Sequence, residues 1–380
     1  MTQKGQKMKA LTLKKMTVVT RHKKASRFLS KPAGGRRATS NDLKPKLIAF
    51  ELTRRCRYQC KHCRADAGSD SVDQLSTQQC KKIIASIARF AKPVLIITGG
   101  EPMERPDLLE IVEYAHERGL RVVMATCGYL MTDEMMAKLK KAGLMALAFS
   151  IDGSSAETHD KFRGSDGAFD AVLRAVDMAK RAKIPFQINT TISRYNAGEI
   201  IGIVELATRL GATCFNAFMM VPTGRGEDFN DMQLDPVEYE SILGELAGLK
   251  LESKINIRVT CGPAWARICE QAKQRGLTGT GCMGGRGFGF VSWKGDIQTC
   301  GFLDISAGNL VKKGFKFREI WLKSKFLNDI RDLDAYKDKC GECEFLGVCG
   351  GCRARAMAKL GDYMAGDPLC GYIPKLRTGK

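Results

Sequence analysis

The chain has 380 residues, of which 44% are hydrophobic and 27% are charged. This composition supports a sizeable core, with room for one large domain and a smaller one. No apolar run approaches the roughly 18 to 20 residues that span a bilayer, and the N-terminus lacks the apolar stretch of a secretory signal, so we expect a cytoplasmic protein without a membrane span.

The positive charge is concentrated at the N-terminus. The formal net charge is +20, and residues 1–46 contain fourteen Lys and Arg against a single acid, Asp42. Such a composition is typical of a solvated, disordered tail, and the alternative is a basic arm that grips nucleic acid or anionic lipid. The rest of the chain is only mildly basic, so we favour the tail and do not expect nucleic acid as a partner.

From residue 47 to about 221, short apolar runs alternate with longer segments of helical period. We predict strands at residues 47–52, 94–98, 121–125, 147–151, 186–191 and 213–221. Repeated strand–helix units predict an α/β fold with a parallel sheet, and six of them predict a partial (β/α)6 barrel of TIM type that is open on one side. In such folds the chemistry gathers at the C-terminal ends of the strands.

Three cysteines follow the first predicted strand, in the pattern Cys56-x3-Cys60-x2-Cys63. The chain has 15 cysteines, and in a cytoplasmic protein these are expected to be metal ligands rather than disulfides. Three thiolates can bind three irons of a four-iron cluster and leave the fourth iron open to a chelating ligand. A zinc knuckle with a distant fourth ligand is the alternative.

This segment and the Glu-Leu-Thr-Arg that precedes it resemble the signature of the radical S-adenosylmethionine (radical SAM) superfamily. The resemblance implies an enzyme in which Cys56, Cys60 and Cys63 hold a [4Fe–4S] cluster. That cluster reduces S-adenosylmethionine (AdoMet), the cosubstrate, and so generates a carbon-centred radical. His62 departs from the pattern, because many members carry an aromatic residue at this position.

The second predicted strand runs into Gly99-Gly100-Glu101-Pro102. Glycine lets the backbone approach a ligand closely, and a carboxylate can accept hydrogen bonds from an ammonium group. The motif resembles the GGEP element of the same superfamily. By that resemblance, Gly99, Gly100, Glu101 and Pro102 hold the amino group of AdoMet.

The ends of the fourth and third predicted strands carry further polar residues. Ser150 ends the fourth strand and Arg163 follows it, and related enzymes use such residues near the AdoMet ribose and carboxylate, which a guanidinium binds well. The third strand ends in Thr126-Cys127-Gly128, where many relatives have Asn before the Gly. We therefore assign no cofactor contact there.

The chain changes character after a helical bridge at residues 236–276. The segment 277–380 is rich in Gly and Cys, as expected of a small domain held by metal clusters. Its seven cysteines are Cys282, Cys300, Cys340, Cys343, Cys349, Cys352 and Cys370.

Their spacing resembles the SPASM domain, with one departure, since two residues rather than three separate the fifth and sixth. The resemblance implies one or two auxiliary [4Fe–4S] clusters. It assigns Cys340, Cys343, Cys349 and Cys370 to one set and the remaining three cysteines to another. The three-cysteine set lacks a fourth ligand, which is supplied by Cys261 or Cys269 or is absent. We expect Cys80 and Cys214 to be ordinary packed cysteines.

Further segments, at 185–191, 221–226, 300–303, 349–356 and 361–370, resemble the tetrapyrrole-modifying radical SAM enzymes, and most of all the heme synthase group. This implies oxidative decarboxylation of two propionates of Fe-coproporphyrin III to the vinyl groups of heme b, through a 5′-deoxyadenosyl radical. An iron-porphyrin substrate and a low-potential electron donor are the implied partners. Guanidinium forks suit carboxylates, so we expect one or two of four arginines to bind propionates, and the others to be surface charges or neighbours of a cluster. The four are Arg225, Arg286, Arg353 and Arg355.

Two alternatives stay open within the superfamily. Ala264-Trp265-Ala266 stand where a His is expected in the heme synthase pattern, so decarboxylation of a related tetrapyrrole or modification of a heme d1 precursor is the first. A SPASM peptide maturase is the second, although residues 1–46 are too short for a peptide-recognition domain. We divide the chain into a tail (1–46), a radical SAM core (47–235), a helical bridge (236–276) and an auxiliary domain (277–380).

Overall fold

The computed structural model describes residues 43–69, 75–273 and 276–375, so all but the last four residues of the predicted tail lie outside the described residues. Within these ranges ten strands form one sheet in the order β10-β9-β8-β1-β2-β3-β4-β5-β6-β7. The strands are β1 (Leu47–Glu51), β2 (Val94–Thr98), β3 (Arg121–Thr126), β4 (Leu144–Ser150), β5 (Phe186–Ile192), β6 (Cys214–Met219), β7 (Asn256–Thr260), β8 (Phe288–Val291), β9 (Asp296–Gln298) and β10 (Gly308–Asn309).

The six predicted strands correspond to β1 through β6, which pair in parallel with their neighbours. A seventh parallel strand, β7, lies in the stretch 236–276 that we expected to be helical, and it pairs with β6. In β7, exposed Asn256 and Arg258 flank buried Ile257. This alternation is only five residues long and lies between two helices, so the sequence pattern of the whole stretch indicates a helix and the strand is not recognised.

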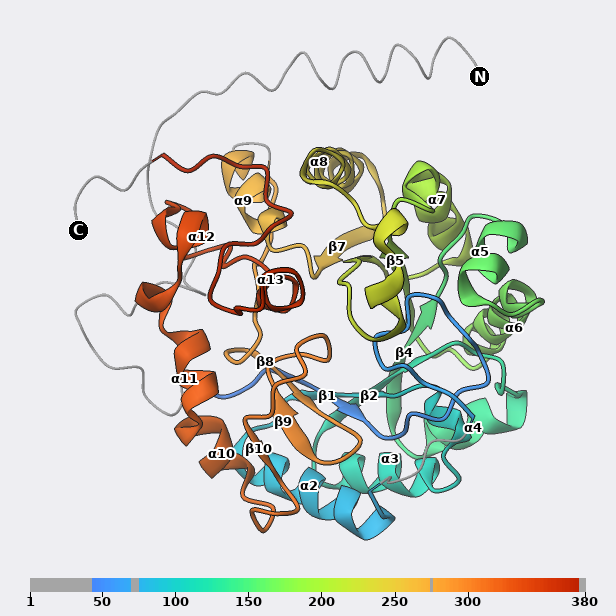
Figure 1. Cartoon of the computed structure of the whole chain (residues 1–380). Coiled ribbons are helices and arrows are strands. Elements are labelled where there is room, and N and C mark those ends of the chain that lie inside the picture. The colour runs from blue at the N-terminus through green and yellow to red at the C-terminus, as the bar shows by residue number, and fades with distance from the viewer. Residues whose placement is uncertain (1–42, 70–74, 274–275, 376–380) are drawn as a thin grey trace.

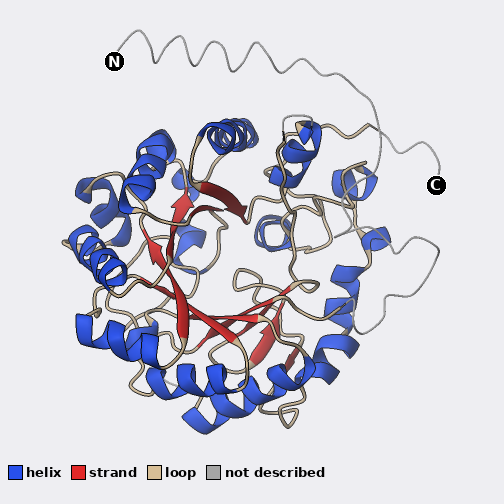
Figure 2. Ribbon diagram, turned by 180° about the vertical axis from the view of Figure 1, so that it is seen from behind, coloured by secondary structure: helices blue, strands red, loops and turns tan. Residues whose placement is uncertain are grey.

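Helices cover the outer side of the curved sheet (Figure 2). The helices of the described ranges are α2 (Thr77–Phe90), α3 (Leu108–Glu117), α4 (Asp133–Lys141), α5 (Ala156–Arg163), α6 (Ala168–Arg181), α7 (Ile200–Leu210), α8 (Pro236–Glu252), α9 (Ala264–Gln271), α10 (Phe317–Lys323), α11 (Lys325–Arg331), α12 (Asp338–Glu342) and α13 (Arg353–Leu360), of which α13 lies inside the curve (Figure 1). Two begin at capping boxes, α2 at Ser76 with Gln79 and α8 at Asp235 with Glu238, which fixes where these helices start. None of the helices in the described ranges combines the length and apolarity needed to cross a bilayer.

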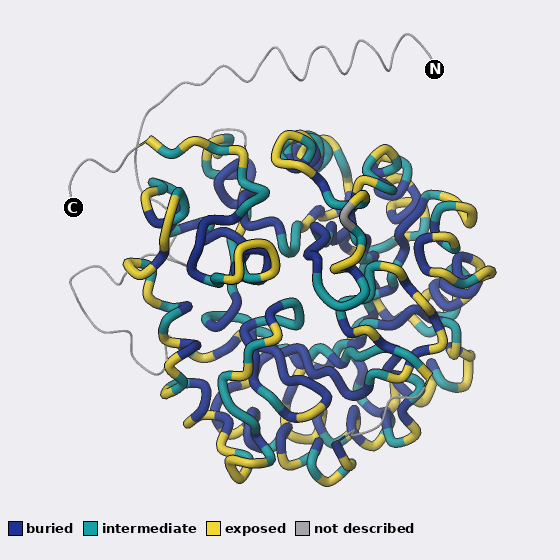
Figure 3. Tube along the Cα trace, in the orientation of Figure 1, coloured by how far each residue is buried: buried dark blue, intermediate teal, exposed yellow. Residues whose placement is uncertain are grey.

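The core lies between the sheet and the inner faces of these helices, while the outer helix faces are exposed (Figure 3). Val94-Leu-Ile-Ile-Thr98 of β2 is typical of a strand in a parallel sheet, because β-branched side chains pack well on a pleated surface covered by helices. Leu95 and Ile97 of β2 are fully buried in one core cluster that also includes Ile83 and Ile87 of α2.

The cysteine-rich C-terminal segment continues the same sheet. β8 pairs in parallel with β1, and β9 and β10 follow in antiparallel order (Figure 1). On the outer side, Phe317 of α10 packs against Phe90 of α2 with ring centroids 6.2 Å apart. The loops after β1 and after β8 therefore emerge side by side at the same edge of the sheet.

Candidate active site

The loop after β1 brings three cysteines together. Cys56 and Cys60 are buried in one small cluster with Tyr58 and Ala67, and Cys63 packs against it. The backbone N–H of Ala67 donates to Cys63 Sγ at 3.5 Å. Three convergent thiols in an apolar setting, with an amide aimed at one sulfur, fit the donor set of a four-iron cluster that keeps one iron open.

A fourth thiol, which we had not assigned to this site, lies beside Cys56. Cys127 follows β3 and is buried in the same cluster. A hydrogen bond from Cys127 lowers the pKa of Cys56 to about 7, against the opposing effect of burial. Burial raises the pKa of Cys60 to about 11. The sequence offered one hint of Cys127, which is its position at the C-terminal end of a strand.

The glycines of the Gly99-Gly100-Glu101-Pro102 motif serve a contact that we did not anticipate. A Cβ at Gly99 or Gly100 would overlap the backbone oxygen of Thr53 or Arg55. Instead, Gly100 donates its N–H to Thr53 O at 2.8 Å, and Glu101 donates to Arg55 O at the same distance. The motif therefore attaches the end of β2 to the backbone of the cysteine loop.

Glu101 is fully buried beside this loop. Its carboxylate accepts hydrogen bonds from Thr126 Oγ1 at 2.8 Å, from the Cys127 amide at 2.8 Å and from the Met103 amide at 3.1 Å. Burial raises its pKa. Pro102 begins the short helix that Glu101 caps. These contacts fix the orientation of the carboxylate next to the cysteine loop.

The predicted ligand contact Arg163 ends α5 and is 8% exposed. Arg163 Nη2 pairs with Asp152 Oδ2 at 2.6 Å, and Arg163 Nη1 donates to Cys60 Sγ at 3.8 Å. Burial opposes ionisation of Asp152, but the charge of Arg163 holds the pKa of this carboxyl below its usual value. Ser150 lies two residues before Asp152 and is half-buried.

His62 belongs to the same buried network. Its Nε2 lies 3.5 Å from Asp152 Oδ2, and its ring stacks on Phe162 with centroids 4.1 Å apart. His62 thus makes an aromatic contact at the position where many radical SAM enzymes carry an aromatic residue. Asp152 thus connects the cysteine loop to the end of β4. The sequence signal that could have identified Asp152 is its position two residues after the end of a strand.

The four cysteines of the first auxiliary set line one cavity, with Arg267 and Asp367 at its wall. They are Cys340, Cys343, Cys349 and Cys370. Arg353 Nη2 donates to Cys340 Sγ at 3.5 Å, and the Asp367 amide donates to the same sulfur at 3.3 Å. A cavity with four thiols at its wall and donors aimed at a sulfur fits a fully ligated four-iron cluster.

The second auxiliary set gains a fourth cysteine. Burial raises the pKa of Cys261 well above its usual value, and the neighbouring Cys352, Cys300 and Cys282 raise it further. Cys269 has no cysteine among the groups that shift its pKa, which burial raises to about 11. The structure therefore brings Cys261, and not Cys269, next to the three cysteines.

A buried ion pair lies between the two auxiliary sets. Arg355 Nη1 is 3.0 Å from Asp367 Oδ2, and the two side chains are 1% and 2% exposed. Arg355 Nη2 donates to Cys261 O at 2.8 Å, and Asp367 Oδ2 accepts the Cys352 amide at 2.8 Å. The pair thus positions the backbone of two cysteines in the second set, while the Asp367 amide contacts Cys340 in the first.

The four arginines that we considered for propionate binding have partners within the chain. Each of them donates to backbone oxygens. They are Arg225, Arg286, Arg353 and Arg355. Their guanidinium groups stabilise loops around the cysteine sites, and carboxylate binding by any of them stays a prediction.

Among the described residues, no group of three or more His, Cys, Asp or Glu side chains is arranged to hold a single metal ion.

Two family profiles match the chain. The radical SAM superfamily matches residues 50–207, and the iron–sulfur cluster-binding SPASM domain matches residues 282–344.

Curated relatives cover most of the chain. A protein of Methanosarcina barkeri named AdoMet-dependent heme synthase is 45% identical over 87% of this chain and 97% of its own length. The Fe-coproporphyrin III synthase of the same organism is 33% identical over 90% of each chain. The mycofactocin maturase MftC of Mycobacterium tuberculosis is 30% identical over 88% of this chain and 83% of its own length.

Solved structures share the fold. Streptococcus suis SuiB bound to the precursor peptide SuiA matches with a TM-score of 0.70 at 16% identity, over 88% of this chain and 77% of that one. The enzyme anSMEcpe with bound AdoMet and a peptide matches with a TM-score of 0.67 at 17% identity, over 86% of this chain and 94% of that one.

The family match confirms the expectation of an enzyme and indicates which cofactors it uses. A radical SAM domain implies a [4Fe–4S] cluster and AdoMet, and a SPASM domain implies auxiliary iron–sulfur clusters. The cysteine sets described above suit both. With curated relatives at up to 45% identity over nearly their whole length, the chain belongs to the radical SAM superfamily, in the group of enzymes that carry a SPASM domain.

Proposed function

We propose that this enzyme makes heme b by oxidative decarboxylation of two propionates of Fe-coproporphyrin III. One observation carries the proposal, which is the 45% identity to a named AdoMet-dependent heme synthase over 97% of that protein. The relatives named for other activities match at 33% and 30%. An iron porphyrin is then the substrate, and a low-potential carrier supplies electrons.

In this proposal each group of residues has a separate task. Cys56, Cys60 and Cys63 hold the radical-generating cluster. Gly99 through Pro102 hold the AdoMet amino group, with Glu101 already oriented by three hydrogen bonds, and Ser150 and Arg163 lie toward the rest of AdoMet. Arg163 also donates to Cys60 Sγ, so one side chain spans the cluster and its ligand.

The auxiliary residues form two complete sets. One set has four cysteines at the wall of a single cavity, namely Cys340, Cys343, Cys349 and Cys370. The other consists of Cys282, Cys300, Cys352 and the additional Cys261. We assign both sets to the auxiliary domain that begins at residue 277, with Cys261 reaching it from the end of β7.

The chemistry balances without a general base. When bound, the radical cluster with AdoMet supplies a 5′-deoxyadenosyl radical that removes one hydrogen atom from the substrate, and the auxiliary clusters supply an acceptor for an electron. Each propionate then loses the hydrogen atom, carbon dioxide and one electron, and a vinyl group is left. The chain's own residues bind and orient the substrate and exclude water from the site. No titrating side chain has to move a proton.

The test is an anaerobic assay of the reconstituted holoenzyme with reductant, AdoMet and Fe-coproporphyrin III, followed by mass spectrometry. We expect the porphyrin to lose the mass of two formic acids, with one 5′-deoxyadenosine formed per vinyl. A reaction without porphyrin measures uncoupled AdoMet cleavage. Cleavage of AdoMet with the porphyrin unchanged would overturn the heme assignment and retain the radical one.

A related tetrapyrrole is the second candidate, favoured by Ala264-Trp265-Ala266 in place of an expected His and by the 33% relative. The same assay with didecarboxysiroheme or a heme d1 precursor distinguishes it. A maturase activity of the kind named for the 30% relative would leave all of these porphyrins unchanged.

A further inference from the structure

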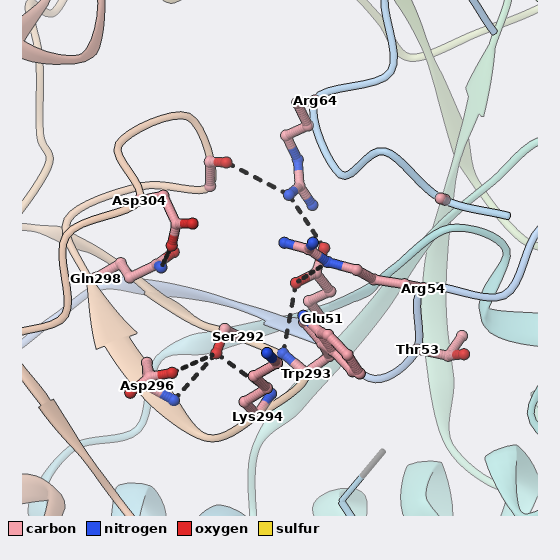
Figure 4. Close-up of polar contacts among 12 residues, drawn as sticks. Glu51, Thr53, Arg54, Arg64, Ser292, Trp293, Lys294, Asp296, Gln298 and Asp304 are labelled. Atoms are coloured by element: carbon pink, nitrogen blue, oxygen red, sulfur yellow. Dashed lines mark hydrogen bonds and ion pairs between the residues drawn. The ribbon is translucent and has the colours of Figure 1, made fainter. Parts of the chain in front are cut away.

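The loop that carries the radical-site cysteines is unusually basic. Residues 53–64 contain five Arg and Lys and no acid. Three of these side chains are exposed, namely Arg55, Arg57 and Lys61, and two are half-buried, namely Arg54 and Arg64. The half-buried pair points to one carboxylate, that of Glu51 at the end of β1 (Figure 4).

Glu51 has no exposed surface, and its charge is shared. Arg64 Nη1 lies 3.2 Å from Oε1, the Trp293 amide donates to Oε2 at 3.4 Å, and Arg54 Nε is 3.8 Å from Oε2. Neither arginine forms an ion pair with another acid in the described part of the chain. One carboxylate against two guanidinium groups leaves one positive charge unbalanced.

Arg64 uses its guanidinium within the protein. Besides Glu51 it contacts Gly301 O at 3.4 Å and lies over the Phe290 ring at 4.8 Å. Gly301 is so close that a Cβ there would overlap the guanidinium carbon. Arg64 therefore joins the radical-site loop to the loop of Cys300, and it is not available to a ligand.

Arg54 is different, because its guanidinium forms no hydrogen bond with any described residue. It is held at one edge by Glu51 and lies over the Trp293 ring at 5.2 Å, with its side chain 32% exposed. A guanidinium has five N–H donors in a fixed fork that matches a carboxylate. Arg54 is thus pre-oriented by its ion pair with Glu51 and partly exposed, and its guanidinium forms no hydrogen bond with a described residue, unlike the four arginines named earlier.

The position of Arg54 favours the substrate over AdoMet as the source of the carboxylate. β1 lies between β2 and β8 in the sheet. Glu101 follows β2, whereas Arg54 turns toward Trp293, which follows β8 on the other side. Arg54 is also only two residues from Cys56, so the Cα atoms of these two residues lie within about 7 Å of each other.

We propose that Arg54, oriented by Glu51 and Trp293, binds a carboxylate of the substrate beside the radical site. The inference rests on the proposed function, in which that carboxylate is a propionate of the iron porphyrin. Arg55, one residue away, is exposed and provides a matched control.

The experiment titrates Fe-coproporphyrin III into reconstituted holoenzyme and follows the Soret absorbance. Losing a charge-assisted pair should raise the apparent Kd of Arg54→Gln by about tenfold or more, while Arg55→Gln stays within about twofold of wild type. With the porphyrin methyl esters, which carry no negative charge, wild type and Arg54→Gln should bind alike. AdoMet affinity and uncoupled AdoMet cleavage should be unchanged.

Each of the other possible outcomes would contradict either this inference or the proposed function. Equal porphyrin binding by wild type and Arg54→Gln overturns this inference and leaves the proposed function intact. A loss confined to AdoMet binding shows that the carboxylate belongs to AdoMet and overturns it too. Wild type that binds no porphyrin overturns the proposed function itself. If Arg54→Gln loses its iron, Arg54→Lys keeps the charge without the fork and should weaken porphyrin binding by about threefold.

Discussion

The radical-site loop and the auxiliary cysteine sets solve the same ligation problem in different ways. The loop places three thiols within eight residues of one segment, beside the buried pair of Arg163 and Asp152. The first auxiliary set gathers four thiols from residues 340–370, and the second gathers four from positions spread over residues 261–352. Three ligands leave an iron open for a reactant, and four ligands close the cluster, so our proposal assigns the chemistry to the first site and electron transfer to the others.

The largest expected effect comes from breaking the three-thiol site. We expect Cys60→Ala to lower the rate of AdoMet cleavage by about a thousandfold or more, because a four-iron cluster held by two thiols is not retained in a reactive form. The auxiliary clusters lie on other segments and should remain. Iron analysis and 5′-deoxyadenosine formation measure the two effects.

Cys214→Ala is the control for that variant. Cys214 is buried in β6 and lies outside all three cysteine sets, so its removal should leave iron content and AdoMet cleavage at wild-type levels. Wild-type AdoMet cleavage by Cys60→Ala would contradict the assignment of the radical site.

The next variant tests whether the second auxiliary set is closed. Cys261→Ala should lower the iron content by up to about four atoms per chain and suppress the oxidative product while leaving uncoupled AdoMet cleavage. Cys269→Ala is the control, since Cys269 is a buried thiol that lies only eight residues away. Equal iron loss in both variants, or in neither, would mean that Cys261 is not the fourth ligand.

A third variant addresses the connection between the auxiliary sets. Arg355→Met leaves Asp367 buried without its partner, and breaking a buried pair in this way costs about 3–5 kcal/mol in the free energy of unfolding. Arg181→Gln breaks an exposed pair with Asp133 and should cost under about 1 kcal/mol. Anaerobic thermal unfolding of the holoproteins, followed by circular dichroism, compares them, and similar melting temperatures would contradict the structural role of Arg355.

Patterns within one segment predicted this fold and site well. The apolar runs located β1 to β6, because each is a short β-rich run between helical segments, and the Cys56-x3-Cys60-x2-Cys63 spacing located the cysteine cluster of the candidate active site. Strand ends also located Glu101 and Arg163 within the network around that site. Local sequence is informative here because the ligands and their backbone turn lie on one loop.

Contacts between distant segments were not predictable in the same way. The choice of Cys261 over Cys269 depends on β7, a five-residue strand whose alternation is too short to recognise between two helices. The contacts of Arg54 with the Trp293 ring and of Arg64 with Gly301 O depend on β8 lying beside β1, although these segments are far apart in the chain. No periodicity or spacing within a segment carries that information.

The smallest effect that we predict concerns the sulfur contacts of two buried arginines. Hydrogen bonds and positive charge near cluster sulfurs stabilise the reduced state and raise the reduction potential. Arg163 donates to Cys60 Sγ at 3.8 Å in the radical site, and Arg353 donates to Cys340 Sγ at 3.5 Å in the first auxiliary set. Each arginine should therefore tune its own cluster alone.

Arg163→Gln, titrated without AdoMet and followed by EPR, should lower the potential of the radical cluster by about 60 mV, the equivalent of a tenfold change in a one-electron equilibrium. Arg163→Lys should recover part of that shift, because it restores the charge but not the planar fork. Arg353→Gln should instead shift an auxiliary signal and leave the radical cluster unchanged. A shift of both clusters by either variant would contradict separate tuning, since it would mean that the substitution acts through the fold rather than through one sulfur.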